Sequence, residues 1–338
     1  MSITTVSRVL NDTGYPMRPE TRQRVLEAID ALDFRPSPLA RGLLGKSTRT
    51  IALIIPDISN PYYPLLSRGV EDVASEQDYT VIFCNTDRKL AKLRSYLEVL
   101  REKQTDGIIF AGGGIESEGE SIQLEELGGP VVLVGRHRWP FPSVQVDNLA
   151  AAYEATSHLL GLGHRRIAFL GGPHNLTSAR DRLKGYRQAM EELSDGVSEE
   201  LIQDGDFAFE SGYRLMVSIL DNASRKPTAL FAANDQMALG AISAAFDLGI
   251  DVPKELAVVG FDDIPAGRYV RPSLTTIALP TYEMGASAAR LLLRTLAGEP
   301  VEHPLYLPTR LVVRQSSGKP ITPTTKSQRL QGGTPWQS

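Results

Sequence analysis

The 338-residue chain has a single cysteine, Cys84, so an internal disulfide is excluded. Such a composition suits a reducing compartment. Cys84 lies in the apolar run TVIFCN, which favours a small core residue over a nucleophile. The sequence also lacks an apolar stretch near the ~20 residues of a membrane span, and its N-terminus lacks the basic-then-apolar pattern of a signal peptide. We therefore expect a cytoplasmic protein without membrane partners.

The patterns typical of enzymes are also missing. The three glycines of AGGGIESEGE are not followed by the Lys-Ser/Thr of a phosphate-binding loop, and they do not have dinucleotide-binding spacing. The histidines show no spacing typical of zinc ligands, and no Ser/His/Asp set can be placed. These five histidines are His137, His158, His164, His174 and His303. We therefore expect no metal, no cofactor and no enzymatic activity.

The charge is unevenly distributed. The net charge of the chain is −4, yet residues 1–50 contain eight Lys and Arg against five Asp and Glu, a net of +3. The remaining residues therefore carry −7. A basic segment on an acidic body indicates polyanion binding confined to that segment.

From residue 50 onward, short apolar runs alternate with amphipathic stretches. Near-continuous apolarity over such short lengths predicts strands covered on both faces, as in a parallel sheet. The runs are 50–56, 80–85, 106–112, 130–135, 166–172, 229–235 and 256–263, with 274–280 as a further candidate. Gly163 and Gly249 have the positions of C-cap glycines after two of the intervening helices. The pattern predicts an α/β body, and its many strands favour two similar lobes.

Residues 1–49 have a different pattern. They predict an all-α head with one helix at 4–11 and a second at 18–33 that begins at Pro19. In the first helix, Val6 and Val9 lie on one face, while small polar residues and Arg8 lie mostly on the other. Such a polar face suits a DNA major groove, but an amphipathic surface helix fits the decapeptide equally well.

The segment TTVSRVLN (4–11), followed by RPETRQRVLEAIDALDFRPSPLARGLLGKSTRTIALIIPDISNPYYP (18–64), resembles the lactose-repressor/galactose-repressor family of transcriptional regulators. The resemblance extends from residue 2 to about 318. It implies a two-lobed body of the periplasmic-binding-protein type (type I) and a DNA-binding head. It assigns the recognition helix to 2–11, with Ile3, Thr4 and Arg8 at base-reading positions and Ser7 and Asn11 near phosphates. It also assigns a hinge helix to SPLARGLLG, where Leu43, with Ala40 beside it, matches a leucine wedged between base steps.

Family members usually carry a further helix before this point, and here Met1 stands where its turn should end. An upstream start codon, a trimmed chain and a true loss of the helix each explain this. We favour the upstream start, because the recognition and hinge residues otherwise keep the family pattern. Without that helix, we expect Val6 and Val9 to lack a packing partner and the chain to bind DNA poorly.

Polar residues follow the predicted strands. They are Asp57, Ser59, Asn60, Asn85, Asn234, Asp235, Asp262 and Asp263. Each alone is more often a helix N-cap or turn residue, and Asp235 best fits a pure cap. Together they should cluster at one edge of the sheets, where open α/β folds bind ligands. Arg180, Arg182 and Phe207 add guanidinium groups and an aromatic face, which with carboxylates and amides suit a sugar.

The resemblance supports this site. It implies that Arg182, Asn234 and Asp262 occupy effector-binding positions and that Phe207 is the aromatic effector residue. It places Ser59, Asn60, Tyr62 and Tyr63 in a facing loop of the first lobe. For Tyr62 and Tyr63, packing against the lobe is an equally good interpretation.

The predicted domains follow from these patterns. They are a partial helix-turn-helix head (1–36), a hinge (37–48), an effector-binding and dimerisation body (49–318) and a disordered tail (319–338). The body has lobe one at 49–148 plus 279–303 and lobe two at 149–278 plus 304–318. We expect a homodimeric repressor whose affinity for operator DNA is switched by a small-molecule effector, and the polar and aromatic residues above favour a sugar as that effector. The alternative is a transport-type sugar-binding protein, which has no use for Arg8 or Leu43.

Overall fold

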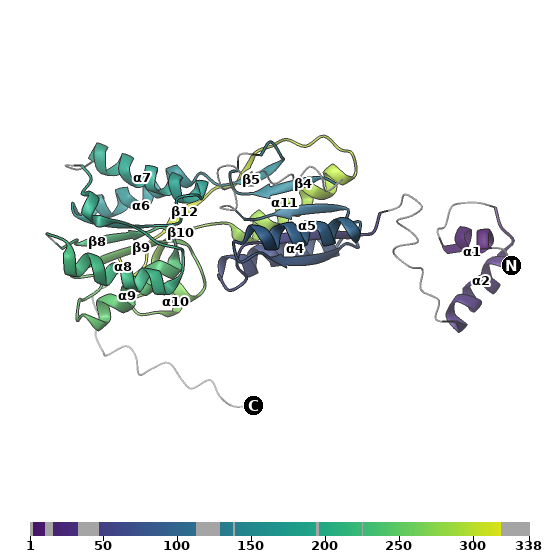
Figure 1. Cartoon of the computed structure of the whole chain (residues 1–338), viewed down its shortest axis with the longest axis horizontal. Helices are drawn as coiled ribbons and strands as arrows, with labels where there is room; N and C mark the ends of the chain where they lie inside the picture. The colour runs from purple at the N-terminus through teal and green to yellow at the C-terminus, as the bar shows by residue number, and fades with distance from the viewer. Residues whose placement is uncertain are drawn as a thin grey trace, which may run out of the picture. The chain divides into compact units, whose positions relative to one another are not determined.

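The computed structural model describes residues 3–10, 16–32, 47–112, 129–137, 139–193, 196–224 and 226–318 (Figure 1). The chain divides into two units, Met1–Thr48 and Arg49–Ser338, and each is described by itself. Among the described residues, no helix is both long and apolar enough to cross a membrane.

The first unit contains two helices in contact, α1 (Ile3–Leu10) and α2 (Pro19–Ala31). Pro19 occupies the first turn of α2, where its missing N–H leaves no hydrogen bond unmade. Val9 is buried and Val6 is half-buried. The expectation that Val9 lacks a packing partner is therefore wrong.

The first lobe of the body is a parallel six-stranded sheet with the order β11-β5-β4-β3-β1-β2. Its strands are β1 (Thr50–Ile55), β2 (Thr80–Asn85), β3 (Gly107–Phe110), β4 (Val131–Val134), β5 (Ser143–Gln145) and β11 (Leu305–Tyr306). Its helices are α4 (Tyr62–Ser75), α5 (Leu90–Glu102) and α11 (Thr281–Leu296). Ile51 and Leu53 pack on the α4 and α11 side, whereas Ala52 and Ile54 pack on the α5 side. This double burial explains the continuous apolar run of β1.

The second lobe has a matching sheet with the order β12-β10-β9-β8-β6-β7, in which only β12 runs antiparallel to its neighbour. Its strands are β6 (Ile167–Gly171), β7 (Ile202–Asp204), β8 (Ala229–Ala232), β9 (Ala257–Asp262), β10 (Thr275–Ala278) and β12 (Arg310–Val312). Its helices are α6 (Asn148–Gly161), α7 (Thr177–Leu193), α8 (Phe209–Asn222), α9 (Asp235–Asp247) and α10 (Ala266–Tyr269), with a 3-10 turn, η2, at Glu199–Leu201. Helices α6 and α7 pack together on one side of the sheet, and α8 and α9 on the other (Figure 1).

Every predicted strand is present, and Gly163 and Gly249 have the positive φ of C-cap glycines, 96° and 71°. Cys84 is buried in the first-lobe core, as predicted. The short strands β5, β7, β11 and β12 were not predicted. Strand β11 pairs with β5, so it belongs to the first lobe. The next strand, β12, belongs to the second lobe, so the chain crosses between the lobes for the last time between Tyr306 and Arg310. The sequence placed this crossing a few residues earlier, near 304.

Candidate functional site

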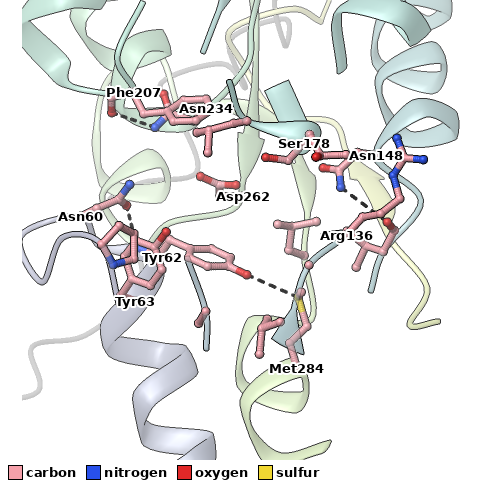
Figure 2. Close-up of a pocket in the computed structure, with 18 of the residues that line it drawn as sticks. Asn60, Tyr62, Tyr63, Arg136, Asn148, Ser178, Phe207, Asn234, Asp262 and Met284 are labelled. Carbon is pink, nitrogen blue, oxygen red and sulfur yellow. Dashed lines mark hydrogen bonds between the residues drawn. The ribbon is translucent and has the colours of Figure 1, made fainter. Parts of the chain in front are cut away.

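The two lobes face each other across a cavity of about 110 Å³. Its walls come from residues that follow the carboxyl ends of strands in both sheets, where open α/β folds bind ligands. Figure 2 shows Asp262 between the first-lobe tyrosines, Tyr62 and Tyr63, and the second-lobe pair Phe207 and Asn234. Seven of the eight predicted effector residues line this cavity: Asn60, Tyr62, Tyr63, Arg182, Phe207, Asn234 and Asp262.

Arg182 projects from α7 and is buried. Its Nε donates to Asn148 Oδ1 at 2.9 Å, and its Nη1 donates to the carbonyl oxygen of Ala233. Its Nη1 also lies 3.8 Å from Asp262 Oδ1. Burial lowers the pKa of Arg182, and the nearby carboxyl of Asp262 opposes that shift. Asn148, at the start of α6, and the backbone of Ala233 therefore hold the guanidinium in one orientation.

Asp262 ends β9 in an unusual backbone conformation, with φ of +121°. Its side chain is buried, and this burial raises its pKa to about 8, while Arg182 lowers the pKa and Asp235 raises it further. A carboxyl group with this pKa exchanges its proton near neutral pH, so it can accept or donate a hydrogen bond. Asp263 instead forms ion pairs with Arg268 and Arg314 and does not line the cavity.

Asn234 is the N-cap of α9, because its Oδ1 accepts a hydrogen bond from Met237 N at 3.0 Å. Its Nδ2 donates to the carbonyl oxygen of Phe207 at 2.9 Å. Asp235 is not the cap that the sequence predicted. Its buried carboxyl group accepts from Ile264 N at 2.8 Å and Thr276 Oγ1 at 2.6 Å, and burial raises its pKa to about 6. It therefore joins α9 to the end of the second sheet.

Phe207 has a left-handed backbone with φ of +71°, and its ring lies over Gly172. A Cβ at Gly172 would lie 2.1 Å from Phe207 Cζ, so only glycine leaves room for the ring. The guanidinium carbons of Arg88 and Arg182 lie 5.7 and 6.0 Å from the ring centroid. Arg88 thus brings a first-lobe cation to a second-lobe ring across the cavity.

The first-lobe loop before α4 supplies Asn60 and the two tyrosines. Asn60 Oδ1 accepts from Tyr62 N at 3.0 Å, and Tyr62 Oη approaches Met284 Sδ at 3.6 Å (Figure 2). The rings of Tyr62 and Tyr63 meet edge to face with centroids 5.0 Å apart. Burial raises the pKa of both tyrosines, so they stay neutral. Both side chains therefore pack against the lobe and line the cavity.

Ser59 is the exception among the eight. It lines a second, neighbouring cavity, and its Oγ donates to Asp57 Oδ1 at 2.6 Å. Arg180, which the sequence also singled out, is turned toward His174 O and Thr177 Oγ1 and lines neither cavity.

Several lining residues were not predicted. Arg136 follows β4 and pairs across the lobes with Asp181, with Nη2 and Oδ1 2.5 Å apart. A search of the residues after PVVLVG could have found it. Asn148 follows β5, a strand too short to recognise, and Met284 lies on α11 far along the chain. Arg88, His137, Thr177 and Ser178 complete the unpredicted polar lining.

In the head, Ile3, Thr4, Ser7 and Arg8 all lie on α1, and the Arg8 side chain is exposed. Asn11, Ala40 and Leu43 lie outside the described residues.

Comparison with known proteins decides the family. Residues 1–37 match the model for bacterial regulatory proteins of the lacI family, and residues 156–317 match the periplasmic binding protein-like domain. The chain is 41% identical over 323 residues to the HTH-type transcriptional regulator DegA of Bacillus subtilis (strain 168), covering 94% of this chain and 95% of DegA. The chain belongs to the lacI family of bacterial regulatory proteins. As a lacI-family protein it is a ligand-responsive transcriptional regulator, and the transport-type alternative is set aside.

Two solved structures of transcriptional regulators share this architecture. The transcriptional regulator CelR in complex with cellobiose superposes with a TM-score of 0.73 and 32% identity, covering 94% of this chain and 96% of CelR. The lac repressor dimer bound to operator and the anti-inducer ONPF superposes with a TM-score of 0.82 and 26% identity, again covering 94% and 96%.

Proposed function

We propose that the interlobe cavity binds a small carbohydrate, which switches the affinity of the protein for operator DNA. The observation that carries this proposal is the grouping of Arg182, Asn234 and Asp262 beside the Phe207 ring in one cavity. A guanidinium, an amide and a carboxyl group suit adjacent hydroxyls, and an aromatic ring suits the apolar face of a sugar. The cellobiose bound to CelR, a protein of the same fold, is consistent with this ligand class.

The switch is proposed to act by linkage. Both lobes contribute to the cavity, so an occupant stabilises one lobe arrangement over another. Operator affinity then changes by the coupling free energy, typically about 1–3 kcal/mol. Residues 1–36 serve as the DNA-binding head, residues 37–48 as the hinge and residues 49–318 as the effector and dimerisation body. The paired heads of a cytoplasmic homodimer would meet adjacent half-sites. The lac repressor, which has the same architecture, is bound to its operator as a dimer.

In this proposal, Ile3, Thr4 and Arg8 read bases, and Ser7 and Asn11 contact phosphates. Leu43, with Ala40 beside it, inserts between base steps in the minor groove. The lining groups are assigned to binding and not to catalysis. Arg182 is held by Asn148 and Ala233, and no nucleophile with an adjacent base is found among the described lining residues.

A two-stage experiment tests this function. A thermal-shift panel of mono- and disaccharides identifies ligands, and fluorescence anisotropy then measures binding to DNA flanking the protein's own gene, with and without each ligand. We expect a ligand that raises the melting temperature to change DNA affinity by about fivefold or more. Leu43→Ala should weaken DNA binding and leave ligand binding unchanged. DNA affinity that is the same with and without every stabilising ligand would contradict the proposal.

A further inference from the structure

A second cavity of about 470 Å³ opens beside the first one. The two cavities share three wall residues, Asn60, Arg88 and Phe207. We call the first the inner cavity and the second the outer cavity. Because the shared residues come from both lobes, the two spaces form one cleft with Phe207 and Arg88 between its parts.

The inner cavity is small for a ligand site. Its volume of about 110 Å³ falls below the roughly 300–1,000 Å³ typical of small-molecule pockets. The outer cavity, at about 470 Å³, lies within that range. A single sugar ring held by Asp262 and Arg182 would leave the outer cavity to water, whereas a ligand of two rings would occupy both parts.

We propose that the effector is a neutral disaccharide, with one ring in the inner cavity and the second in the outer cavity. This inference rests on the proposed function and names the ligand class of the same cleft. Phe207 marks the position between the two rings, because its side chain is a wall of both cavities. The left-handed backbone of Phe207 directs the ring to this position, and Gly172, which has no Cβ, leaves room for it.

The outer walls define the chemistry of the second ring. Asp57 and Ser59 contribute from the first lobe, while Asp206, Glu210 and Gln236 contribute from the second. Asp57 Oδ1 already accepts from Ser59, and Asp206 Oδ1 accepts from Ala208 N at 2.9 Å, so both carboxylates are held in place. Carboxylates and an amide accept hydrogen bonds from sugar hydroxyls.

The charge of these walls excludes an acidic second ring. Three carboxylates, Asp57, Asp206 and Glu210, face the outer cavity with one cation, Arg88. A phosphate or carboxylate there would meet like charges, which costs binding energy. A neutral sugar ring, whose polar groups are hydroxyls, meets no such repulsion.

Isothermal titration calorimetry on the full chain tests the proposal. The probes are disaccharides, each paired with the methyl glycoside of its non-reducing ring: cellobiose with methyl β-glucoside, maltose with methyl α-glucoside, and lactose with methyl β-galactoside. We expect at least one disaccharide to bind about tenfold or more tightly than its matched glycoside. A phosphate on the second ring should remove this advantage.

Gln236→Trp fills the outer cavity from the first turn of α9 without touching the inner one. We expect it to abolish the advantage of the disaccharide and to keep the Kd of the methyl glycoside within about twofold of wild type. Glu210→Trp, on α8, is a second variant in case Gln236→Trp does not fold. The matched control is Gln188→Trp on an exposed position of α7, which should retain the full advantage.

The outcomes separate the two proposals. If sugars bind but each methyl glycoside binds as tightly as its disaccharide, the two-ring inference is wrong and the proposed function stands. An advantage that survives in both tryptophan variants also overturns the inference. If no saccharide binds, the proposed function itself is wrong.

Discussion

The guanidinium carbon of Arg182 lies 3.7 Å from the centroid of the Phe261 ring. Stacking on this buried ring, together with the hydrogen bond to Asn148, sets the plane of the guanidinium. Its Nη1 consequently stops 3.8 Å from Asp262 Oδ1, too far for a close two-point ion pair. Phe261, the β9 residue before Asp262, thus positions Arg182, the cation that lies near the Asp262 carboxyl group. Arg182 and Asp262 both line the inner cavity.

Asp262→Asn should weaken effector binding. The substitution keeps the size of the side chain but replaces a carboxyl group that can accept or donate hydrogen bonds at either oxygen with an amide that has one acceptor oxygen. A hydrogen-bonding group left unpaired in a buried site costs roughly 1–3 kcal/mol, or about 5- to 150-fold in Kd. Calorimetry with a saccharide selected in the thermal-shift panel measures this effect. The control is Asp263→Asn, whose carboxylate faces Arg268 and Arg314 and not the cavity. It should lower the melting temperature and leave Kd unchanged, so equal losses in both variants would remove Asp262 from the site.

Stability should depend on pH through the same residue. Burial raises the folded-state pKa of Asp262 to about 8 from its ordinary 3.8, so the folded state holds the proton more tightly than the unfolded state. This contribution to stability is complete below pH 3.8 and is lost as pH rises through about 8. Asp235, with a pKa of about 6, adds a similar loss at lower pH.

Urea denaturation at pH 6, 7 and 8 isolates Asp262, because the loss from Asp235 is largely complete by then. The free energy of unfolding of wild type should fall over this range, and that of Asp262→Asn should fall less steeply. Parallel slopes for the two proteins would show that Asp262 is ionised in the folded state at pH 6.

Gly172→Ala should displace the Phe207 ring. The added methyl would lie 2.1 Å from Phe207 Cζ, so the ring must move from its place between Arg88 and Arg182. We expect a loss of effector affinity and a destabilisation of about 1–3 kcal/mol from overpacking. Gly161→Ala at the end of α6 is the control, because a Cβ there meets nothing within 4 Å. Unchanged binding by Gly172→Ala would contradict the assigned role of Phe207.

Arg136→Ala should loosen the contact between the lobes. The Arg136 side chain is 51% exposed, so its pair with Asp181 is expected to contribute no more than about 1 kcal/mol. A double-mutant cycle with Asp181→Ala measures the coupling in effector binding. We expect Kd to rise by less than about fivefold in each single variant, with no further rise in the double variant. Fully additive effects would indicate that the two side chains act separately.

Arg8→Ala should weaken DNA binding and leave the sugar site intact. An arginine that reads a guanine contributes about 1–3 kcal/mol of discrimination. Anisotropy with the target DNA and with a scrambled duplex should show a larger loss for the target. Arg290→Ala on α11, with its side chain 53% exposed, removes the same charge from the body and is the control. Equal losses on both duplexes would mean that Arg8 acts through charge alone.

Much of the site could be predicted because polar residues immediately follow recognisable strands. Asn234 and Asp262 lie at the ends of β8 and β9, and the edge of a parallel sheet brings such positions together. Asn148 and Met284 escaped prediction for a physical reason. Their places on the cavity wall depend on how the two lobes pack, and no local pattern carries that information.

The strands likewise divide into those that the sequence predicts and those that it does not. Long buried strands such as β1 carry a continuous apolar run, whereas β11 has two exposed residues, so it has no such signal. Asp235 illustrates the limit for single residues: an Asp at a helix start suggests a cap, yet its partners are Ile264 and Thr276, residues more than 25 positions away.

The sequence by itself determined the α/β body, the all-α head, the C-cap glycines and the family, because periodicity, turn residues and motif order are local properties of the chain. The tertiary structure alone decided that Ser59 faces a different cavity from Asp262, that Phe207 stands between the two, and that Arg136 joins the lobes. These relationships depend on distances between segments that only the packing of two separate cores brings together.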